Sequence, residues 1–226
     1  MIDAPVSRAA GNRVRIMLRI LIADDHEVVR FGLRQILEAQ ANWEVVAEAS
    51  DGKEAVSRAI ETKPDICILD HSLPLMNGLE VTRQIRARVP KSEILIFTMH
   101  ENEKLVQELL HAGARGYLLK SDAKTYLIEA ITSLASHRPF FTKKVSESLL
   151  DVYLARPEKV SSVITSRERT VVQLIAEGHT NKEVARLLNI SLKTVETHRA
   201  TITRKLQATS SAGLVRYAIR NKIIEA

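Results

Sequence analysis

Five residues of types that can do metal and phosphorus chemistry each lie at the end of a short apolar run. Asp24 and Asp25 follow the first run, Asp70 and Thr98 end two more, and Lys120 ends a fourth. Carboxylates that are brought together repel one another and favour a cation, and their hard oxygen atoms suit Mg²⁺. An aspartate can also attack phosphorus and form an aspartyl phosphate. If these five residues meet, the chemistry that they predict is phosphoryl transfer, with Lys120 and Thr98 binding the phosphoryl oxygens.

Alternating strands and helices would bring these residues to one place. The apolar runs have the length of buried parallel strands, and segments with apolar residues at helical spacing separate them. We expect strands at 19–23, 43–49, 66–70, 93–98 and 116–120, and helices at 28–37, 52–61, 79–89, 103–111 and 123–136. This alternation predicts an α/β doubly wound, five-stranded parallel sheet. In the flavodoxin-like strand order 2-1-3-4-5, the five residues converge at the carboxyl edge of the sheet.

The pattern changes after the fifth helix, where His137-Arg138-Pro139 interrupts it. Beyond a further helix at 145–155 and a polar linker at 156–162, no strand pattern occurs. Capping boxes and N-cap residues instead open helices at about 166–177, 181–188, 192–206 and 211–221. We therefore expect a disordered extension at 1–17, an α/β domain at 18–138, a helix and linker at 139–160, and a small all-α domain at 161–226.

Charge separates the two predicted domains. The 226-residue chain has a net charge of +6, and residues 157–226, with twelve Lys and Arg against six Asp and Glu, carry all of it. Residues 1–156 have no net charge and residues 157–226 are basic, which indicates that the C-terminal part binds a polyanion. The single cysteine, Cys67, excludes a disulfide framework and fits a reducing, cytoplasmic location. No apolar stretch approaches the roughly 18 residues of a membrane span, so no membrane partner is expected.

The segment 192–206 is predicted to be an amphipathic helix with a basic outer stripe. Val195, His198, Ile202 and Leu206 fall on one face. The opposite face carries Lys193, Thr197, Ala200 and Arg204, with Glu196 beside them. Short and basic side chains can approach a major groove closely, and the preceding helix at 181–188 completes a helix-turn-helix. A small helical bundle with a solvated basic face is the alternative.

Over about residues 18–138 the chain resembles the receiver domain of two-component response regulators. The motifs that carry the resemblance are Asp24-Asp25, the run Asp70…Pro74…Gly78, Thr98, and Tyr117…Lys120. The resemblance implies that Asp70 accepts phosphate from a sensor histidine kinase and that Thr98 and Tyr117 are the switch pair. It also implies that Asp25, Asp70 and the Ser72 carbonyl bind Mg²⁺ directly, while Asp24 acts through water. Met99 departs from the small residue common after Thr98, which leaves the lifetime of the phosphoryl group open.

Over about residues 161–224 the chain is similar to the LuxR-type helix-turn-helix, and the two domains together resemble the NarL/FixJ class of response regulators. The matching runs are 165–168, 174–178, 181–185, 190–191 and 193–198. The resemblance implies a homodimer on double-stranded promoter DNA, with RNA polymerase as a further candidate partner. It places base contacts at Glu196, Thr197 and Ala200, phosphate contacts at Lys182, Lys193, Thr194 and Arg199, and Arg204 on the same exposed stripe.

These observations predict a transcription regulator that is controlled by phosphorylation and is not an enzyme. Two alternatives stay open: a regulator of the same shape that a partner protein switches without phosphate, and an Mg²⁺-dependent phosphatase of the haloacid-dehalogenase style. The phosphatase would need an Asp-x-Asp pattern after the first strand, whereas Asp24 and Asp25 are adjacent. The last helix has an apolar stripe of Leu214, Val215, Ala218 and Ile219, which is either a cover for the bundle or part of a dimer face.

Overall fold

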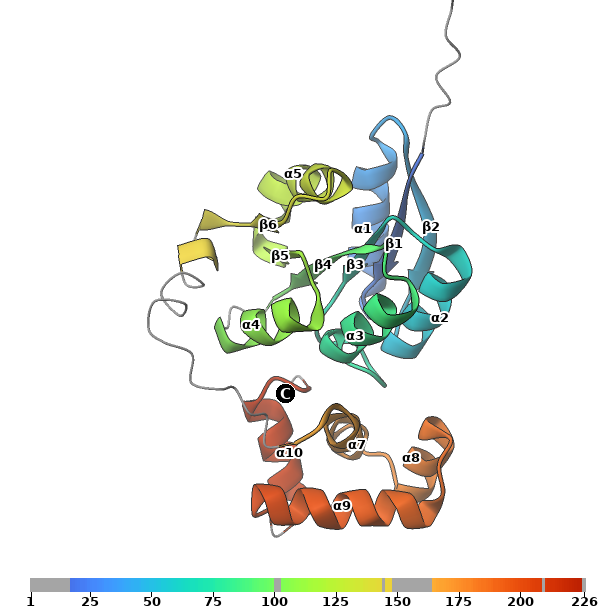
Figure 1. The fold of residues 1–226 in the computed structure, drawn as a ribbon, viewed down its shortest axis with the longest axis vertical. Coiled ribbons are helices and arrows are strands. Elements are labelled where there is room, and N and C mark those ends of the chain that lie inside the picture. Colours follow the sequence, from blue (N-terminus) through green and yellow to red (C-terminus); the bar gives the residue numbers. More distant parts are fainter. Residues whose placement is uncertain (1–16, 100–102, 144, 148–163, 209, 225–226) are drawn as a thin grey trace, which may run out of the picture.

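The structure, a computed structural model, describes residues 17–99, 103–143, 145–147, 164–208 and 210–224. These residues form a sheet flanked by helices and, below it in Figure 1, a separate group of four helices. The predicted extension at 1–17, apart from Met17, and the linker at 156–162 lie outside the described residues. So does the predicted helix at 145–155 beyond residue 147. Among the described helices, none combines the length and the apolar character needed to cross a membrane.

The sheet is parallel throughout, in the order β2-β1-β3-β4-β5-β6. The predicted order 2-1-3-4-5 is therefore confirmed, with one strand added at its end. The strands are β1 (Leu18–Ala23), β2 (Trp43–Ala49), β3 (Ile66–Leu69), β4 (Glu93–Thr98), β5 (Gly116–Leu119) and β6 (Phe140–Phe141). The helices between them are α1 (Glu27–Glu38), α2 (Gly52–Thr62), α3 (Gly78–Arg88), α4 (Glu103–Ala112) and α5 (Ala123–Ala135).

Helices cover both faces of this sheet. Apolar residues of α2, α3 and α4 form one core with residues such as Leu21, Cys67 and Ile96. Residues of α1 and α5 form a second core on the opposite face, with Ile22 and Ile68 among the strand residues. A strand covered on both faces buries every side chain, which is why β3 reads as an uninterrupted apolar run. Figure 1 shows the two layers of helices on either side of the strands.

A sixth strand, near the start of the predicted helix and linker at 139–160, adds to the five strands that we predicted. Phe140 and Phe141 pair in parallel with Gly116 and Tyr117 of β5. The chain turns back through His137, whose φ is 54°, and the Phe140 N–H donates to the Arg115 carbonyl at 3.0 Å. Two residues are too few to show the period-2 alternation that identifies a strand in a sequence. A smaller correction is that β5 ends at Leu119, because Lys120–Asp122 form a short 3₁₀ helix.

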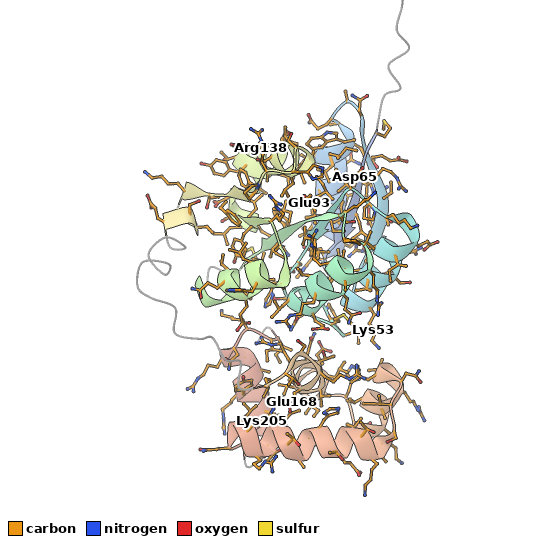
Figure 2. The ribbon with its side chains drawn as sticks, in the orientation of Figure 1. Lys53, Asp65, Glu93, Arg138, Glu168 and Lys205 are labelled. Carbon is orange, nitrogen blue, oxygen red and sulfur yellow. The ribbon has the colours of Figure 1, made fainter. Side chains whose placement is uncertain are left out.

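The second part consists of four helices, close to the predicted bounds. They are α7 (Ser166–Ala176), α8 (Asn181–Leu188), α9 (Leu192–Leu206) and α10 (Ser211–Arg220). The capping boxes of α7 and α8 are both complete. The helices share a core that includes Val171, Val195, Ile202 and Leu214. Lys205 of α9 reaches back to Glu168 of α7, with Nζ 2.7 and 2.9 Å from the two carboxylate oxygens (Figure 2).

Candidate functional site

The carboxyl edge of the sheet brings Asp24, Asp70 and Lys120 together. Asp24 follows β1 and Asp70 follows β3, and these two strands are neighbours. The Lys120 ammonium lies 2.7 Å from Asp24 Oδ2 and 3.0 Å from Asp70 Oδ2. Both aspartates are almost fully buried. The parallel topology therefore converts residues that are far apart in the sequence into one charged cluster.

Burial and the neighbouring charges shift the pKa values of Asp70 and Lys120. Burial raises the pKa of the Asp70 carboxyl, and the adjacent Lys120 ammonium opposes that rise. Burial by itself would lower the pKa of Lys120, but its hydrogen bonds and charge interactions with Asp24 and Asp70 hold it above its usual value. Lys120 is thus a permanent cation at the buried end of the site, where it can neutralise negative charge that is added to Asp70.

Asp25 and His26 extend the cluster towards solvent. His26 Nδ1 lies 2.8 Å from Asp25 Oδ1, and the His26 backbone N–H donates to Asp24 Oδ1 at 3.0 Å. Ligand atoms of Asp24, Asp25, His26 and Asp70 all lie within 4.8 Å of one another. Three carboxylates beside one lysine leave the site with net negative charge, and hard oxygen donors suit Mg²⁺. The donor set of this cluster therefore fits a divalent cation such as Mg²⁺.

The segment 71–77, which we call the acceptor loop, follows Asp70 and leads into α3. The backbone N–H of Ser72 donates to the Asp70 carboxylate, one cause that lowers its pKa. The Gly78 N–H donates to the His71 carbonyl at 2.8 Å, which closes the loop. A Cβ on Gly78 would collide with the Asp70 carbonyl. The loop is therefore packed tightly against the strand end that carries Asp70.

The two residues of the predicted switch pair are both buried. Thr98 ends β4 and is fully buried, and Tyr117 of β5 is 1% exposed within the core beneath α4. Thr98 and Leu119 pair in the β4–β5 ladder, and Lys120 follows Leu119 directly, so Thr98 and Lys120 lie at the same edge of the sheet. Met99, directly after Thr98, is 67% exposed and lies outside the core.

Helix α9 presents the predicted stripe to solvent. Lys193, Glu196, Thr197, Ala200 and Arg204 are all exposed, as is Lys182 on α8. On the opposite side, Val195 and Ile202 are fully buried, and Leu206 packs against the same core. Ser191 caps the start of α9 by accepting the Thr194 N–H at 3.0 Å. The N-terminus of α9, whose free N–H groups favour an anion, thus lies on the same exposed surface as Lys193.

Two of the predicted phosphate-binding residues are engaged within the helical part. The Arg199 guanidinium donates to Asn181 Oδ1 at 2.9 Å and to Ser211 Oγ at 2.6 Å, and it thereby ties α8 to α10. Thr194 Oγ1 lies 2.8 Å from Ser191 Oγ. Arg199 therefore braces the bundle through two N–H groups of a guanidinium that carries five donors.

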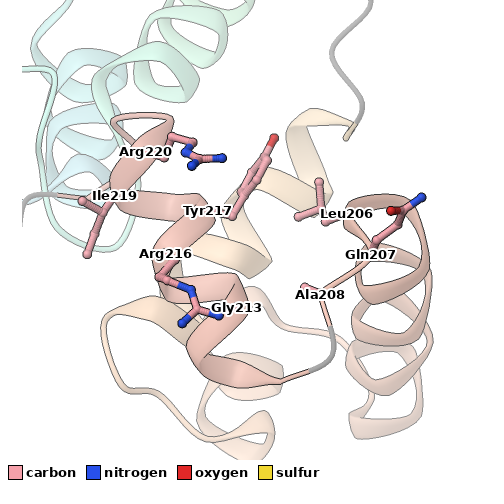
Figure 3. Close-up of a pocket in the computed structure, with 8 residues that line it drawn as sticks. All are labelled: Leu206, Gln207, Ala208, Gly213, Arg216, Tyr217, Ile219 and Arg220. Carbon is pink, nitrogen blue, oxygen red and sulfur yellow. The ribbon is translucent and has the colours of Figure 1, made fainter.

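Helix α10 divides its apolar stripe between two surroundings. Leu214 and Ala218 are buried in the bundle, whereas Ile219 is 36% exposed. Ile219, Arg216 and Arg220 line a hollow between α10 and the end of α9, which Figure 3 shows in close-up. Part of the apolar stripe therefore covers the core of the bundle, and part is exposed, where it could form a dimer face.

A set of residues that sequence reasoning missed joins the two parts of the chain. The buried Gln173 of α7 binds the acceptor loop, and a salt bridge of 3.1 Å joins Arg169 of α7 to Glu108 of α4. Arg83 of α3 donates to Ser166 Oγ at 2.8 Å. In Figure 2, Lys53 on α2 lies at the edge that faces the four helices, and it donates to the Leu187 carbonyl. The one sequence signal was Gln173 itself, a polar residue within the apolar run 171–175.

The comparisons with known proteins agree with this geometry. The chain matches the family model of the response regulator receiver domain over residues 20–132, and that of bacterial regulatory proteins of the luxR family over residues 162–218. The chain belongs to the two-component response regulators. This regulator is 38% identical to the oxygen regulatory protein NreC of Staphylococcus epidermidis over 217 residues, which cover 92% of this chain and 100% of NreC.

Solved structures of relatives lead to the same family. The RcsB response regulator of Salmonella typhimurium has 29% sequence identity and a TM-score of 0.63, covering 89% of this chain and 96% of RcsB. A structure of two RcsB dimers bound to two parallel DNAs matches with 28% identity and a TM-score of 0.57, over 89% of this chain and 97% of that chain. The regulator therefore combines a receiver with a LuxR-type DNA-binding domain and acts in two-component transcription regulation.

Proposed function

We propose that this regulator accepts a phosphoryl group on Asp70 and that the modification controls how helix α9 meets promoter DNA. The observation that carries the proposal is the position of Lys120, whose ammonium lies between Asp24 and the buried Asp70. A buried nucleophile beside a fixed cation is the arrangement that phosphoryl transfer requires, because most of the catalysis is positioning and charge neutralisation.

The phosphoryl transfer joins a carboxylate of this chain to the phosphorus of a donor. An Asp70 carboxylate oxygen forms the bond to phosphorus, the bond between phosphorus and the donor nitrogen of a phosphohistidine breaks, and the histidine leaves. Lys120 neutralises part of the added charge of about −1.5 to −2. Asp25, Asp70 and the Ser72 carbonyl would hold Mg²⁺, with Asp24 acting through water, and the bound ion would supply further positive charge. Thr98 would donate its hydroxyl proton to a phosphoryl oxygen, and the buried Tyr117 would respond to that movement.

Residues 18–138 would act as the receiver unit and residues 161–226 as the DNA-binding unit. In the latter, Lys182, Lys193, Thr194 and Arg199 would contact phosphates, Arg199 through N–H groups other than the two that brace the bundle. Glu196, Thr197 and Ala200 would lie against base edges, since all three are exposed on α9. Arg204, on the same stripe, would add a cationic contact at the far end of the helix.

The proposed partners follow from the two units. A sensor histidine kinase would be the phosphoryl donor, and the site of action would be cytoplasmic because the target is promoter DNA. Two copies would bind together, as RcsB does in its DNA-bound dimers, and RNA polymerase would be a further contact at the promoter. The open part of α10 around Ile219 is a surface where two copies could meet.

A labelling experiment tests the proposed acceptor. Wild-type protein incubated with a labelled phosphohistidine or small acyl phosphate donor and Mg²⁺ should take up one label that survives acid and is lost in base, as expected of an acyl phosphate. Asp70→Asn should take up none, and Asp25→Ala should lose uptake because a metal ligand is missing. Equal labelling of wild type and Asp70→Asn would contradict the assignment.

The same preparation tests both alternatives. An Mg²⁺-dependent phosphatase would release inorganic phosphate from external phosphoesters over many turnovers, whereas the proposed acceptor should take up a single equivalent. A regulator that works without phosphate would take up no label and yet respond to a partner protein. The cluster of Asp24, Asp70 and Lys120 favours the acceptor over this second alternative.

A further inference from the structure

We infer that Gln173 of the DNA-binding domain is a positioning residue for phosphorylation of Asp70, because it holds the acceptor loop from outside the receiver. The inference rests on the proposed function of Asp70. Gln173 lies 96 positions after Asn77, the loop residue that it binds. The inference is that this distant side chain affects how readily the receiver is phosphorylated. The observation behind it is a two-point clamp on the loop backbone.

The clamp uses both ends of one side-chain amide. Gln173 Oε1 accepts the Asn77 N–H at 3.0 Å, and Gln173 Nε2 donates to the Leu73 carbonyl at 3.0 Å. Gln173 is 1% exposed and Asn77 is also buried. Both bonds are therefore shielded from water, and loss of either partner would leave a buried polar group unsatisfied. Gln173 spans the acceptor loop from its third residue to its last.

Other contacts hold the same loop to the same domain. His71, next to Asp70, donates from Nε2 to the Lys222 carbonyl at 2.7 Å. The Leu75 side chain packs against the core of the four helices, and its backbone has a φ of 62°. A leucine in this left-handed region is disfavoured because its Cβ crowds the backbone, so the packing of Leu75 against the second domain helps to maintain an otherwise unfavourable conformation.

The contact between Gln173 and the acceptor loop does not cover the exposed stripe of α9. Lys193, Thr197 and Ala200 remain exposed while Gln173 is in place, and in Figure 1 α7 faces the receiver whereas α9 lies on the far side of its domain. The contact therefore acts on the acceptor loop and not by masking the DNA-binding surface. What it constrains is the backbone that begins beside Asp70 and includes Ser72.

The contact with Gln173 should slow phosphorylation of Asp70. In the proposed function the added phosphoryl group and Mg²⁺ would bind at Asp70 and at the Ser72 carbonyl, so the backbone of the acceptor loop would have to adjust around them. An acceptor loop that is held at two points must be released before its backbone can rearrange around an added group. Loss of the clamp removes that step, so Asp70 should be phosphorylated faster.

The experiment compares full-length wild type with Gln173→Ala and Gln173→Glu. The second variant keeps the size of the side chain, but it cannot donate to the Leu73 carbonyl and it places a carboxylate beside Glu177, which Gln173 Nε2 contacts at 2.8 Å. Gln84→Ala is the matched control, because Gln84 bonds only to Glu80 of its own helix among the described side-chain contacts. Two quantities are measured: amide hydrogen exchange at Asn77, and the rate of labelling from a small acyl phosphate with Mg²⁺.

Gln173→Ala removes the acceptor of the Asn77 N–H and should exchange this amide about tenfold faster than wild type, a factor that corresponds to about 1.4 kcal/mol. Gln173→Glu keeps an acceptor for that N–H but loses the bond to the Leu73 carbonyl, so its exchange should also be faster than wild type, by a smaller factor. Both variants should also take up label several-fold faster, while Gln84→Ala matches wild type in both measurements. Unchanged exchange and labelling in both variants would overturn the inference, and so would faster exchange with an unchanged labelling rate. If wild type takes up no label at all, the proposed function of Asp70 fails instead, and the exchange data still decide whether the clamp exists.

Discussion

Lys120 Nζ lies 3.0 Å from Asp70 Oδ2, and the same ammonium lies 2.7 Å from Asp24 Oδ2. One cation thus stands against two buried carboxylates. Such a site binds added positive charge well, but it is costly for folding, because ionised groups are held away from water. The balance between these two consequences can be measured.

Asp70→Asn should raise the free energy of unfolding at neutral pH by on the order of 1 kcal/mol. Burial raises the pKa of Asp70 in the folded state, so its ionised form is disfavoured by folding at every pH above that raised value. The gain should shrink as the pH falls through the raised pKa, where wild-type Asp70 becomes neutral. Urea unfolding at several pH values measures both effects, and a loss of stability at neutral pH would contradict the burial argument.

The opposite pH dependence is expected for Glu168. Burial alone would raise its pKa, but bonds from Lys205 and from Thr165 lower it. A carboxyl with a lowered folded pKa contributes stability above its unfolded pKa and loses that contribution as the pH falls through the folded value. Glu168→Gln, which can keep the capping box, should therefore destabilise the helical domain at neutral pH and have little effect in acid. Lys205→Met should reproduce this pattern if the ion pair is the cause.

Gly78→Ala should destabilise the receiver and slow labelling of Asp70. The added Cβ would collide with the Asp70 carbonyl and approach the His71 Cα, so the acceptor loop must move. Gly32→Ala is the matched control, because no atom lies within 4 Å of the added Cβ, and alanine in a helix is favoured over glycine by about 0.5–1 kcal/mol. Urea unfolding should separate the two variants in opposite directions, and equal effects would show that the loop is not tightly packed.

The exposed stripe of α9 should separate affinity from sequence preference. Lys193 lies at the N-terminus of the helix, where backbone N–H groups already favour a phosphate. Lys193→Ala should weaken binding to specific and random DNA alike and lower the salt slope by about 1. Thr197→Ala removes no charge and should change the preferred sequence at an unchanged slope. Gel-shift titrations over a range of salt measure both, and an unaltered slope in Lys193→Ala would remove this residue from the interface.

Much of the fold was predictable because its signals are local. Buried runs such as 66–69 identify strands, and Thr165 with Glu168 and Thr180 with Glu183 mark helix starts through bonds three residues apart. The convergence of Asp24, Asp70 and Lys120 followed from the order of the strands alone. The acidic site was therefore predictable once the local signals had identified the strands and the strand order had placed their ends at one edge.

The features that sequence reasoning missed depend on distant partners. The strand at Phe140 exists because the β5 edge accepts it, and two residues carry no period of their own. The clamp at Gln173 joins residues almost a hundred positions apart, and nothing near Gln173 indicates what it binds. The DNA contact of Arg199 was implied by the resemblance to the LuxR-type helix-turn-helix and stays a prediction; what the sequence did not indicate is its bonds to Asn181 and Ser211, which come from the packing of three helices.

The most direct measurement of the central claim compares the affinity of one promoter fragment for wild type and for Asp70→Asn, each with and without a phosphoryl donor and Mg²⁺. Phosphorylation should tighten binding of wild type at least several-fold and increase the share of dimer in sedimentation. Asp70→Asn should bind with the unphosphorylated affinity under both conditions. An equal response of both proteins, or no response of a wild type that is shown to be labelled, would contradict control of DNA binding through Asp70.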